Sequence, residues 1–143
     1  MKKLISIITV SLIFSAITGY ADDKFVDFSA LPQTAQQFAS ANFKDKKVAV
    51  VKQDRSFLGA ITDGYDIGTE IEFDSDGVWK EVSAKTSAVP NSIIPEAILN
   101  YIRDNFKSSP VIQIEKKEYG YKIELATKQD LKFSKQFVFL GLD

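Results

Sequence analysis

The sequence contains neither cysteine nor histidine. The absence of cysteine excludes disulfide scaffolds, thiolate metal sites and cysteine nucleophiles. The absence of histidine excludes every mechanism that uses imidazole as a general base. The sequence also lacks a Gly-x-Ser-x-Gly elbow, a Ser-x-x-Lys pair, a Walker loop and a Gly-x-Gly-x-x-Gly turn. It therefore predicts that the protein is not an enzyme.

The remaining composition is that of an ordinary folded protein. The 143 residues are 45% hydrophobic and 26% charged, which excludes disorder and fibrous repeats. Basic and acidic residues almost balance, with 18 Lys and Arg against 19 Asp and Glu. Because nucleic-acid binding requires an excess of positive charge, we expect no nucleic-acid partner.

The N-terminus has the three parts of a secretory signal peptide. Met1 and two lysines form a basic head, an apolar run follows over residues 4–17, and small residues at positions 19 and 21 precede two aspartates. The apolar run is shorter than the roughly 20 residues that a membrane-spanning helix needs. The sequence predicts a signal peptide over residues 1–21, a periplasmic or secreted location, and no stable membrane insertion after cleavage.

The predicted mature chain, residues 22–143, is long enough to bury one hydrophobic core without disulfides, so we expect a single domain. Two stretches of it, about residues 24–85 and 88–143, share one plan. Each begins with a proline followed by apolar residues at the spacing of an amphipathic helix. The matching motifs, 63 residues apart, are Leu31-Pro32 with Ile94-Pro95 and Asn42-Phe43 with Asn105-Phe106.

After each predicted helix the apolar residues alternate with polar ones, as they do in strands. Residues 69–73 and 78–82 are predicted to form one hairpin, and residues 130–133 and 137–140 another. Each half is thus a helix followed by an antiparallel meander of four strands. The predicted fold class is α+β: a tandem repeat with two helices packed on one face of a sheet of about eight strands, whose other face is open.

This layout resembles the PepSY-like family of beta-lactamase-inhibitor-like proteins, which Bacteroidetes-type bacteria export. The resemblance covers the chain from about Leu31 onward, with Ser134-Lys135-Gln136 in place of the usual Asp-x-x-Gly turn. It implies an exported, non-enzymatic binding or inhibitory module and identifies no target. The motifs that carry it are Leu31-Pro32 with Asn42-Phe43, Ile71–Trp79, Ile94-Pro95 with Asn105-Phe106, and Ile114–Leu125.

The open face of the sheet is the predicted binding surface, because alternation places the charged strand residues there. The partner would be an unknown periplasmic or surface protein, such as an enzyme to be inhibited. Alternatively, these charged residues form a face that only contacts water and binds no partner. Trp79 would anchor a partner if it points outward and join the core if it points inward; alternation leaves both open. The predicted partner-binding residues are Trp79, Glu70, Glu72, Lys122, Glu124 and Lys132.

The turn Asp74–Gly77 carries the one other candidate site. Asp74 and Asp76 could bind calcium, which takes about six to eight oxygen ligands, with Glu72, Asp63 or Asp66 as further ligands. The same residues are typical of a plain hairpin turn, since Asp-Gly tolerates positive φ. The alternative function is therefore a calcium-responsive or small-ligand-binding periplasmic protein, and calcium is the candidate cofactor. A structural accessory domain is the third possibility.

Overall fold

The computed structural model describes residues 24–62, 68–84 and 87–143. The predicted signal peptide, and Asp63 and Asp66, lie outside the described residues. In chain order the elements are β1 (Lys24–Val26), η2 (Phe28–Ala30), α2 (Gln33–Asn42), β2 (Val48–Lys52), β3 (Ser56–Ile61), β4 (Glu70–Asp74), β5 (Trp79–Ser83), η3 (Asn91–Ile93), α3 (Glu96–Asn105), β6 (Val111–Lys117), β7 (Gly120–Leu125), β8 (Asp130–Ser134) and β9 (Phe139–Leu142).

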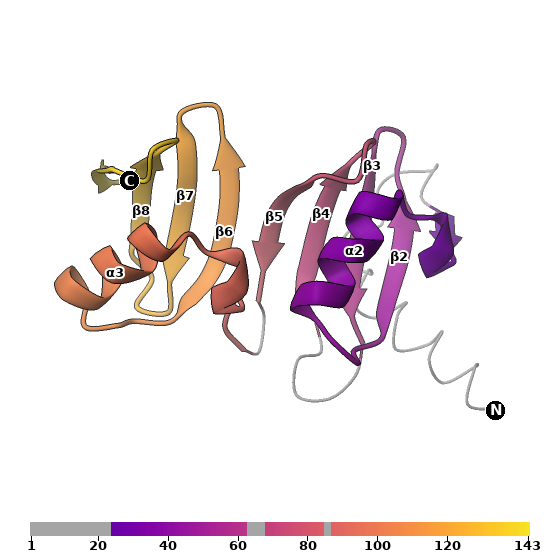
Figure 1. The fold of residues 1–143 in the computed structure, drawn as a ribbon, viewed down its shortest axis with the longest axis horizontal. Helices are drawn as coiled ribbons and strands as arrows, with labels where there is room; N and C mark the ends of the chain where they lie inside the picture. The colour runs from indigo at the N-terminus through magenta and orange to yellow at the C-terminus, as the bar shows by residue number, and fades with distance from the viewer. Residues whose placement is uncertain (1–23, 63–67, 85–86) are drawn as a thin grey trace.

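All described strands belong to one antiparallel sheet, in which β1 to β9 lie in sequence order. Both helices lie over the same face, α2 on the N-terminal strands and α3 on the C-terminal strands (Figure 1). The predicted α+β class, with two helices on a single open sheet, is confirmed. The sheet has nine strands rather than about eight, because Lys24–Val26 pairs with β2. Three residues are too few for alternation to predict a strand.

The two helices begin and end at corresponding residues. Pro32 and Pro95 occupy the N-cap positions, where a missing N–H costs nothing. Each helix ends where the N–H of a phenylalanine, Phe43 or Phe106, donates to a carbonyl four residues back. The buried residues of each helix are four apart, Ala35 and Ala39 in α2 and Ile98 and Ile102 in α3. This spacing keeps one apolar stripe on the sheet.

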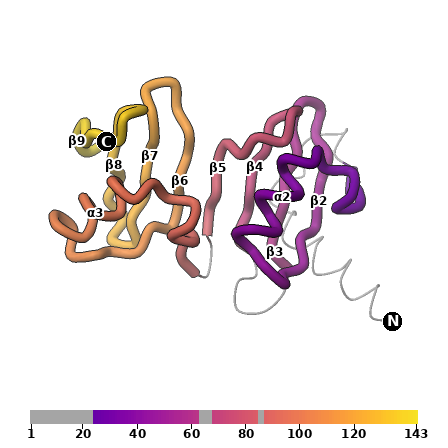
Figure 2. Tube along the Cα trace, viewed as in Figure 1, coloured from indigo at the N-terminus to yellow at the C-terminus, as the bar shows by residue number. Residues whose placement is uncertain are grey.

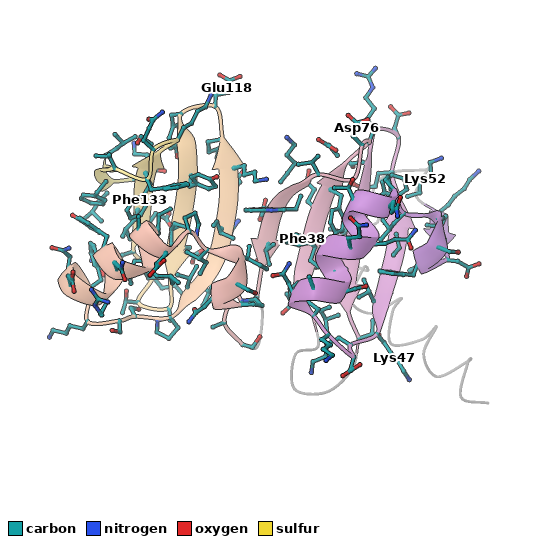
Figure 3. The ribbon with its side chains drawn as sticks, viewed as in Figure 1. Phe38, Lys47, Lys52, Asp76, Glu118 and Phe133 are labelled. Carbon is teal, nitrogen blue, oxygen red and sulfur yellow. The ribbon has the colours of Figure 1, made fainter. Side chains whose placement is uncertain are left out.

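Aromatic side chains join each helix to its strands. In the N-terminal half, Phe38 of α2 meets the fully buried Phe73 edge to face at 5.9 Å. In the C-terminal half, Tyr101 of α3 meets Phe133 in the same way at 5.6 Å. Figure 3 shows Phe38 on α2 and Phe133 on the sheet near α3. Such pairs stabilise by about 0.5–1.5 kcal/mol beyond the area they bury.

Candidate binding surface

Over β4 to β8, the sheet face opposite the helices carries the charged residues that alternation placed there. Over β2 and β3 the same face holds a buried apolar cluster of Val51, Leu58 and Ala60. In β4, Glu70 and Glu72 flank the fully buried Ile71. In β7 and β8, the charged residues likewise alternate with buried Ile123, Leu131 and Phe133. The structure thus brings five of the predicted partner-binding residues onto one face: Glu70, Glu72, Lys122, Glu124 and Lys132.

Five of the charged residues on this face form a single row across the strands. Glu72 lies opposite Glu81, and Glu81 lies opposite Glu115 on the next strand. The row continues from Glu115 to Lys122 and from Lys122 to Lys132. Because like charges directly opposite each other destabilise a sheet, the three glutamates carry an electrostatic cost in the native state. A cationic group from a partner would reduce that cost.

The arrangement of the glutamates changes the pKa of Glu81. Burial raises the pKa of Glu81, and repulsion from Glu115 and Glu72 raises it further. The amide of Gln113, which donates a hydrogen bond to Glu81, acts in the opposite direction. Sequence reasoning missed Glu81 and Glu115, because it read neighbouring charges along a strand rather than across strands. The position of Glu115 on the open face could have been predicted from the sequence, because it alternates with the apolar Ile114.

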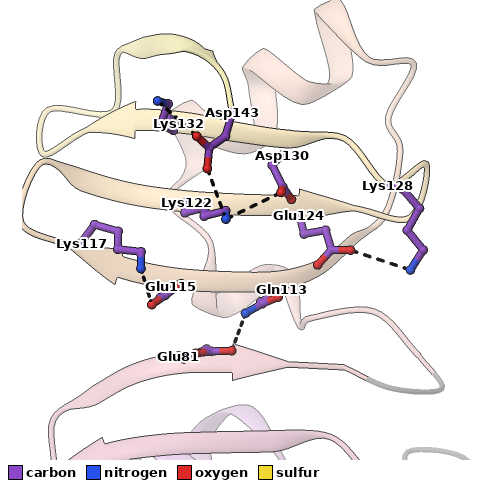
Figure 4. A network of polar contacts seen from close by, with 10 residues as sticks. All are labelled: Glu81, Gln113, Glu115, Lys117, Lys122, Glu124, Lys128, Asp130, Lys132 and Asp143. Atoms are coloured by element: carbon purple, nitrogen blue, oxygen red, sulfur yellow. Dashed lines mark hydrogen bonds and ion pairs between the residues drawn. The ribbon is translucent and has the colours of Figure 1, made fainter.

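The C-terminal part of the face differs, because its lysines are matched with acids (Figure 4). Lys122 Nζ lies 3.7 Å from Asp130 Oδ2 and 3.3 Å from Asp143 Oδ2. Lys132 Nζ lies 3.4 Å from Asp143 Oδ1. The hydrogen bond from Lys122, with the charge of Lys132, lowers the pKa of the Asp143 carboxyl. Among the described residues no lysine or arginine forms an ion pair with Glu72, so negative charge gathers at the N-terminal end of the row.

Trp79 lies on the helix-covered face and not on the open face. Its indole stacks on Phe38 at 5.8 Å, and Lys116 Nζ lies 4.0 Å from the centre of its ring. The reason is a bulge: the register shifts so that Trp79, rather than Lys80, pairs with the inward-facing Phe73. Of the two orientations left open by alternation, the structure shows the inward one.

The Asp74–Gly77 turn is closed by its own carboxylate. Asp74 Oδ1 accepts hydrogen bonds from the N–H groups of Asp76 at 2.9 Å and Val78 at 3.0 Å, and Lys80 Nζ lies 3.6 Å from Oδ2. Burial acts to raise the pKa of Asp74, but the two N–H donors and Lys80 outweigh it and lower the pKa. Within the part of the chain that the structure describes, no group of three or more acidic side chains is arranged to hold a metal ion. Calcium binding by Asp74 and Asp76 stays a prediction.

Comparison with known proteins identifies relatives of the same fold. The family described as "Putative beta-lactamase-inhibitor-like, PepSY-like" matches residues 59–141. A crystal structure described as a "putative periplasmic protein" of the DUF2874 family from Bacteroides vulgatus is 34% identical, with a TM-score of 0.76, and the match covers 87% of this chain and 99% of that one. No curated protein matches the chain.

Two further solved structures have comparable similarity. A "putative calcium-regulated periplasmic protein" from Bacteroides thetaiotaomicron is 35% identical with a TM-score of 0.76, over 85% of this chain and 97% of that one. A second Bacteroides vulgatus structure, described as a "putative periplasmic protein of unknown function", is 29% identical with a TM-score of 0.75, over 85% of this chain and 98% of that one. These relatives confirm the periplasmic or secreted location. In the described part of the chain, neither helix has the length and apolar character to cross a membrane.

Proposed function

We propose that this chain, which belongs to the PepSY-like, beta-lactamase-inhibitor-like family, is a non-enzymatic module that binds and regulates a periplasmic protein through the open face of its sheet. The observation that carries the proposal is the one-sided architecture: both described helices cover the same face. The other face holds ordered charges in register across five strands. On this proposal the two halves are copies of one unit, which together widen that face.

A sheet suits such a role because it fixes its side chains in advance. Residues opposite each other on neighbouring strands have Cβ atoms about 4.5–5.5 Å apart. A partner therefore meets charges whose positions are already set, and less conformational entropy is lost on binding. Because the surface is charged, we expect association to slow and weaken as the salt concentration rises.

The test is a charge reversal on the face with a matched reversal elsewhere. Partners would be captured from the periplasm of the source organism by cross-linking to the wild-type protein, and the affinity of each identified partner would then be measured. We expect Glu72→Lys to weaken binding at least about tenfold, a loss of roughly 1.4 kcal/mol. The control, Glu118→Lys at the β6–β7 turn, makes the same charge change outside the row.

Two results would count against the open face as the binding surface. One is the absence of any reproducible partner. The other is a partner whose affinity falls equally with Glu72→Lys and Glu118→Lys, since a general change in charge would then explain the loss. Melting temperatures of both variants within a degree or two of wild type would show that the fold is intact.

Calcium regulation is the second candidate function, and the relative described as calcium-regulated favours it. The turn offers the Asp74 carboxylate and the exposed Asp76, and calcium prefers such oxygen ligands. Titration with millimolar calcium during thermal melting tests it: a bound ion would raise the melting temperature, and Asp76→Asn would abolish the rise. Asp104→Asn on α3 is the control. An unchanged melting temperature of the wild-type protein would eliminate this candidate.

A further inference from the structure

A cavity lies where α2 ends and the chain turns back into β2. Its volume is about 500 Å³, within the roughly 300–1,000 Å³ that is typical of small-molecule sites. Figure 2 shows this turn at one end of the N-terminal half. Figure 3 labels Lys47 in the turn and Asp76 at the opposite end of the sheet. The cavity is therefore a separate place from the Asp74–Gly77 turn.

The buried part of the cavity lining is apolar. It consists of Phe28 of η2, Ala39 of α2, Phe43, and Val48 of β2. Ala39 and Phe43 are buried, and Phe28 and Val48 pack partly buried against the core between the helices and the sheet. The cavity thus opens on the helix-covered side of the sheet. An apolar group that enters it would be shielded from water, which is favourable.

The exposed part of the lining is positively charged. The turn contributes three lysines, Lys44, Lys46 and Lys47, and one acid, Asp45. Among the described residues, neither Lys44 nor Lys46 has an ion-pair partner. An excess of positive charge therefore lies at the rim of an apolar cavity.

The corresponding turn of the C-terminal half shows that the fold does not require these lysines. The N–H of Lys46 donates to the carbonyl oxygen of Phe43 at 3.1 Å, and the N–H of Ser109 donates to that of Phe106 at 3.0 Å. Serine therefore forms the same turn as lysine. Residues 107–110 contain one lysine, whereas residues 44–47 contain three.

The charge is also not explained by the end of the helix. Lysines near a helix C-terminus compensate the negative end of its dipole. However, α3 ends with the same backbone hydrogen bond as α2 beside a turn with one lysine. A cavity of about 410 Å³ lies at that place, and its Arg103 is paired with Asp104 at 2.9 Å. Unpaired positive charge thus distinguishes the cavity of the N-terminal half.

We propose that this cavity binds a small organic carboxylate with an aliphatic body, of the kind represented by the anion of a medium-chain fatty acid. The aliphatic body would pack on the apolar lining. The carboxylate would accept charge-assisted hydrogen bonds from Lys44 and Lys46, which are stronger than neutral ones. Asp45, also at the rim, favours a singly charged anion over a phosphate. This site is separate from the open face and does not depend on the function proposed for it.

Nuclear magnetic resonance titration of the protein purified from the periplasm tests the proposal, with octanoate as the probe. Backbone amide signals of residues 39–48 should shift, with a dissociation constant of about 0.1–10 mM. Octan-1-ol lacks the charge and acetate lacks the aliphatic body, so each should bind at least about tenfold more weakly. Binding of octanoate should weaken as the salt concentration rises.

Variants of the rim lysines test which charges hold the carboxylate. The double variant Lys44→Gln with Lys46→Gln should raise the dissociation constant for octanoate at least about tenfold. The matched control is Lys128→Gln with Lys135→Gln, which removes two exposed lysines of the C-terminal half and should leave binding unchanged. Melting temperatures of both double variants would show whether the fold is intact.

Three results would overturn the proposal. The first is the absence of shifts at residues 39–48 with octanoate up to about 10 mM. The second is an affinity that falls equally in the two double variants, since general charge would then hold the anion. The third is acetate binding as tightly as octanoate, because the apolar lining would then contribute nothing.

Discussion

The two halves of the molecule have the same element order but different polar residues. Each has one helix followed by four antiparallel strands, with a phenylalanine of the third strand packed beneath an aromatic residue of the helix. At the turn between the last two strands, however, the N-terminal half uses Asp74 and the C-terminal half Ser134. The comparison shows that the apolar pattern fixes this fold, while turns and surfaces can differ.

The turns illustrate how different side chains make the same hydrogen bonds. Ser134 Oγ accepts the N–H of Val138 at 3.1 Å, as Asp74 Oδ1 accepts that of Val78. The third residue after each acceptor has positive φ: 83° at Gly77 and 66° at Phe137. Glycine adopts that conformation without strain, whereas phenylalanine does not. A contact of Phe137 with Tyr121, at 5.7 Å, offsets part of that strain.

The largest expected effect comes from removing the paired core phenylalanines. Phe73→Ala and Phe133→Ala should each lower the free energy of unfolding by about 3–5 kcal/mol, because both side chains are fully buried and leave a cavity. We expect the greater loss for Phe133, which contacts the rings of both Tyr101 and Phe139. Urea unfolding measures both. A loss for either variant below about 1 kcal/mol would mean that its half does not share the common core.

Gly77 distinguishes the two halves most sharply among the turn residues. In Gly77→Ala the new Cβ would lie 2.7 Å from Pro32 Cβ at the start of α2, and φ is +83°. We expect a loss of about 2 kcal/mol or more, from the backbone strain and the displacement of the helix. Residue 137 already has positive φ, so Phe137→Ala should lower the free energy of unfolding by less than Gly77→Ala does. Equal losses in urea unfolding would contradict the assigned role of Gly77.

Sequence patterns predicted the helices, the hairpins and the charged face, because each depends on local periodicity. The alternation of Glu70, Ile71, Glu72 and Phe73 was enough to place those residues. Trp79 could not be placed, since the bulge that turns it inward depends on the pairing of β5 with β4. The glutamate row was also beyond prediction, because the register of Glu81 and Glu115 is set by the junction of the two halves.

Exchanging the turn acceptor should have a smaller effect that depends on pH. In Asp74→Ser, a neutral hydroxyl replaces a charged acceptor, so we expect a loss of about 1 kcal/mol near neutral pH. Because folding lowers the pKa of Asp74, its stabilisation is present above the ordinary value of 3.8 and is lost as the pH falls through the folded value. Wild type and variant should therefore converge in acid.

Melting temperatures between about pH 3 and pH 7 measure that convergence. Ser134→Ala is the matched control, since it removes the corresponding acceptor of the C-terminal half without changing a charge. Its effect should be nearly the same at every pH in this range. A gap between wild type and Asp74→Ser that stays constant into acid would show that the charge of Asp74 contributes nothing.

The smallest expected effect concerns the glutamate row. Folding raises the pKa of Glu81, so its ionised form destabilises the native state above the folded value, and this penalty disappears below the ordinary value of 4.5. Glu81→Gln keeps an acceptor for Gln113 and removes the charge, so we expect a gain of about 0.5 kcal/mol at pH 7 that vanishes toward pH 4.5. Glu118→Gln, outside the row, should change nothing in the same urea titrations. In the C-terminal half we expect the opposite effect: Lys132→Gln should lower the stability, since it removes an ion pair with Asp143. A loss of stability for Glu81→Gln at pH 7 would mean that its hydrogen bond with Gln113 outweighs repulsion along the row.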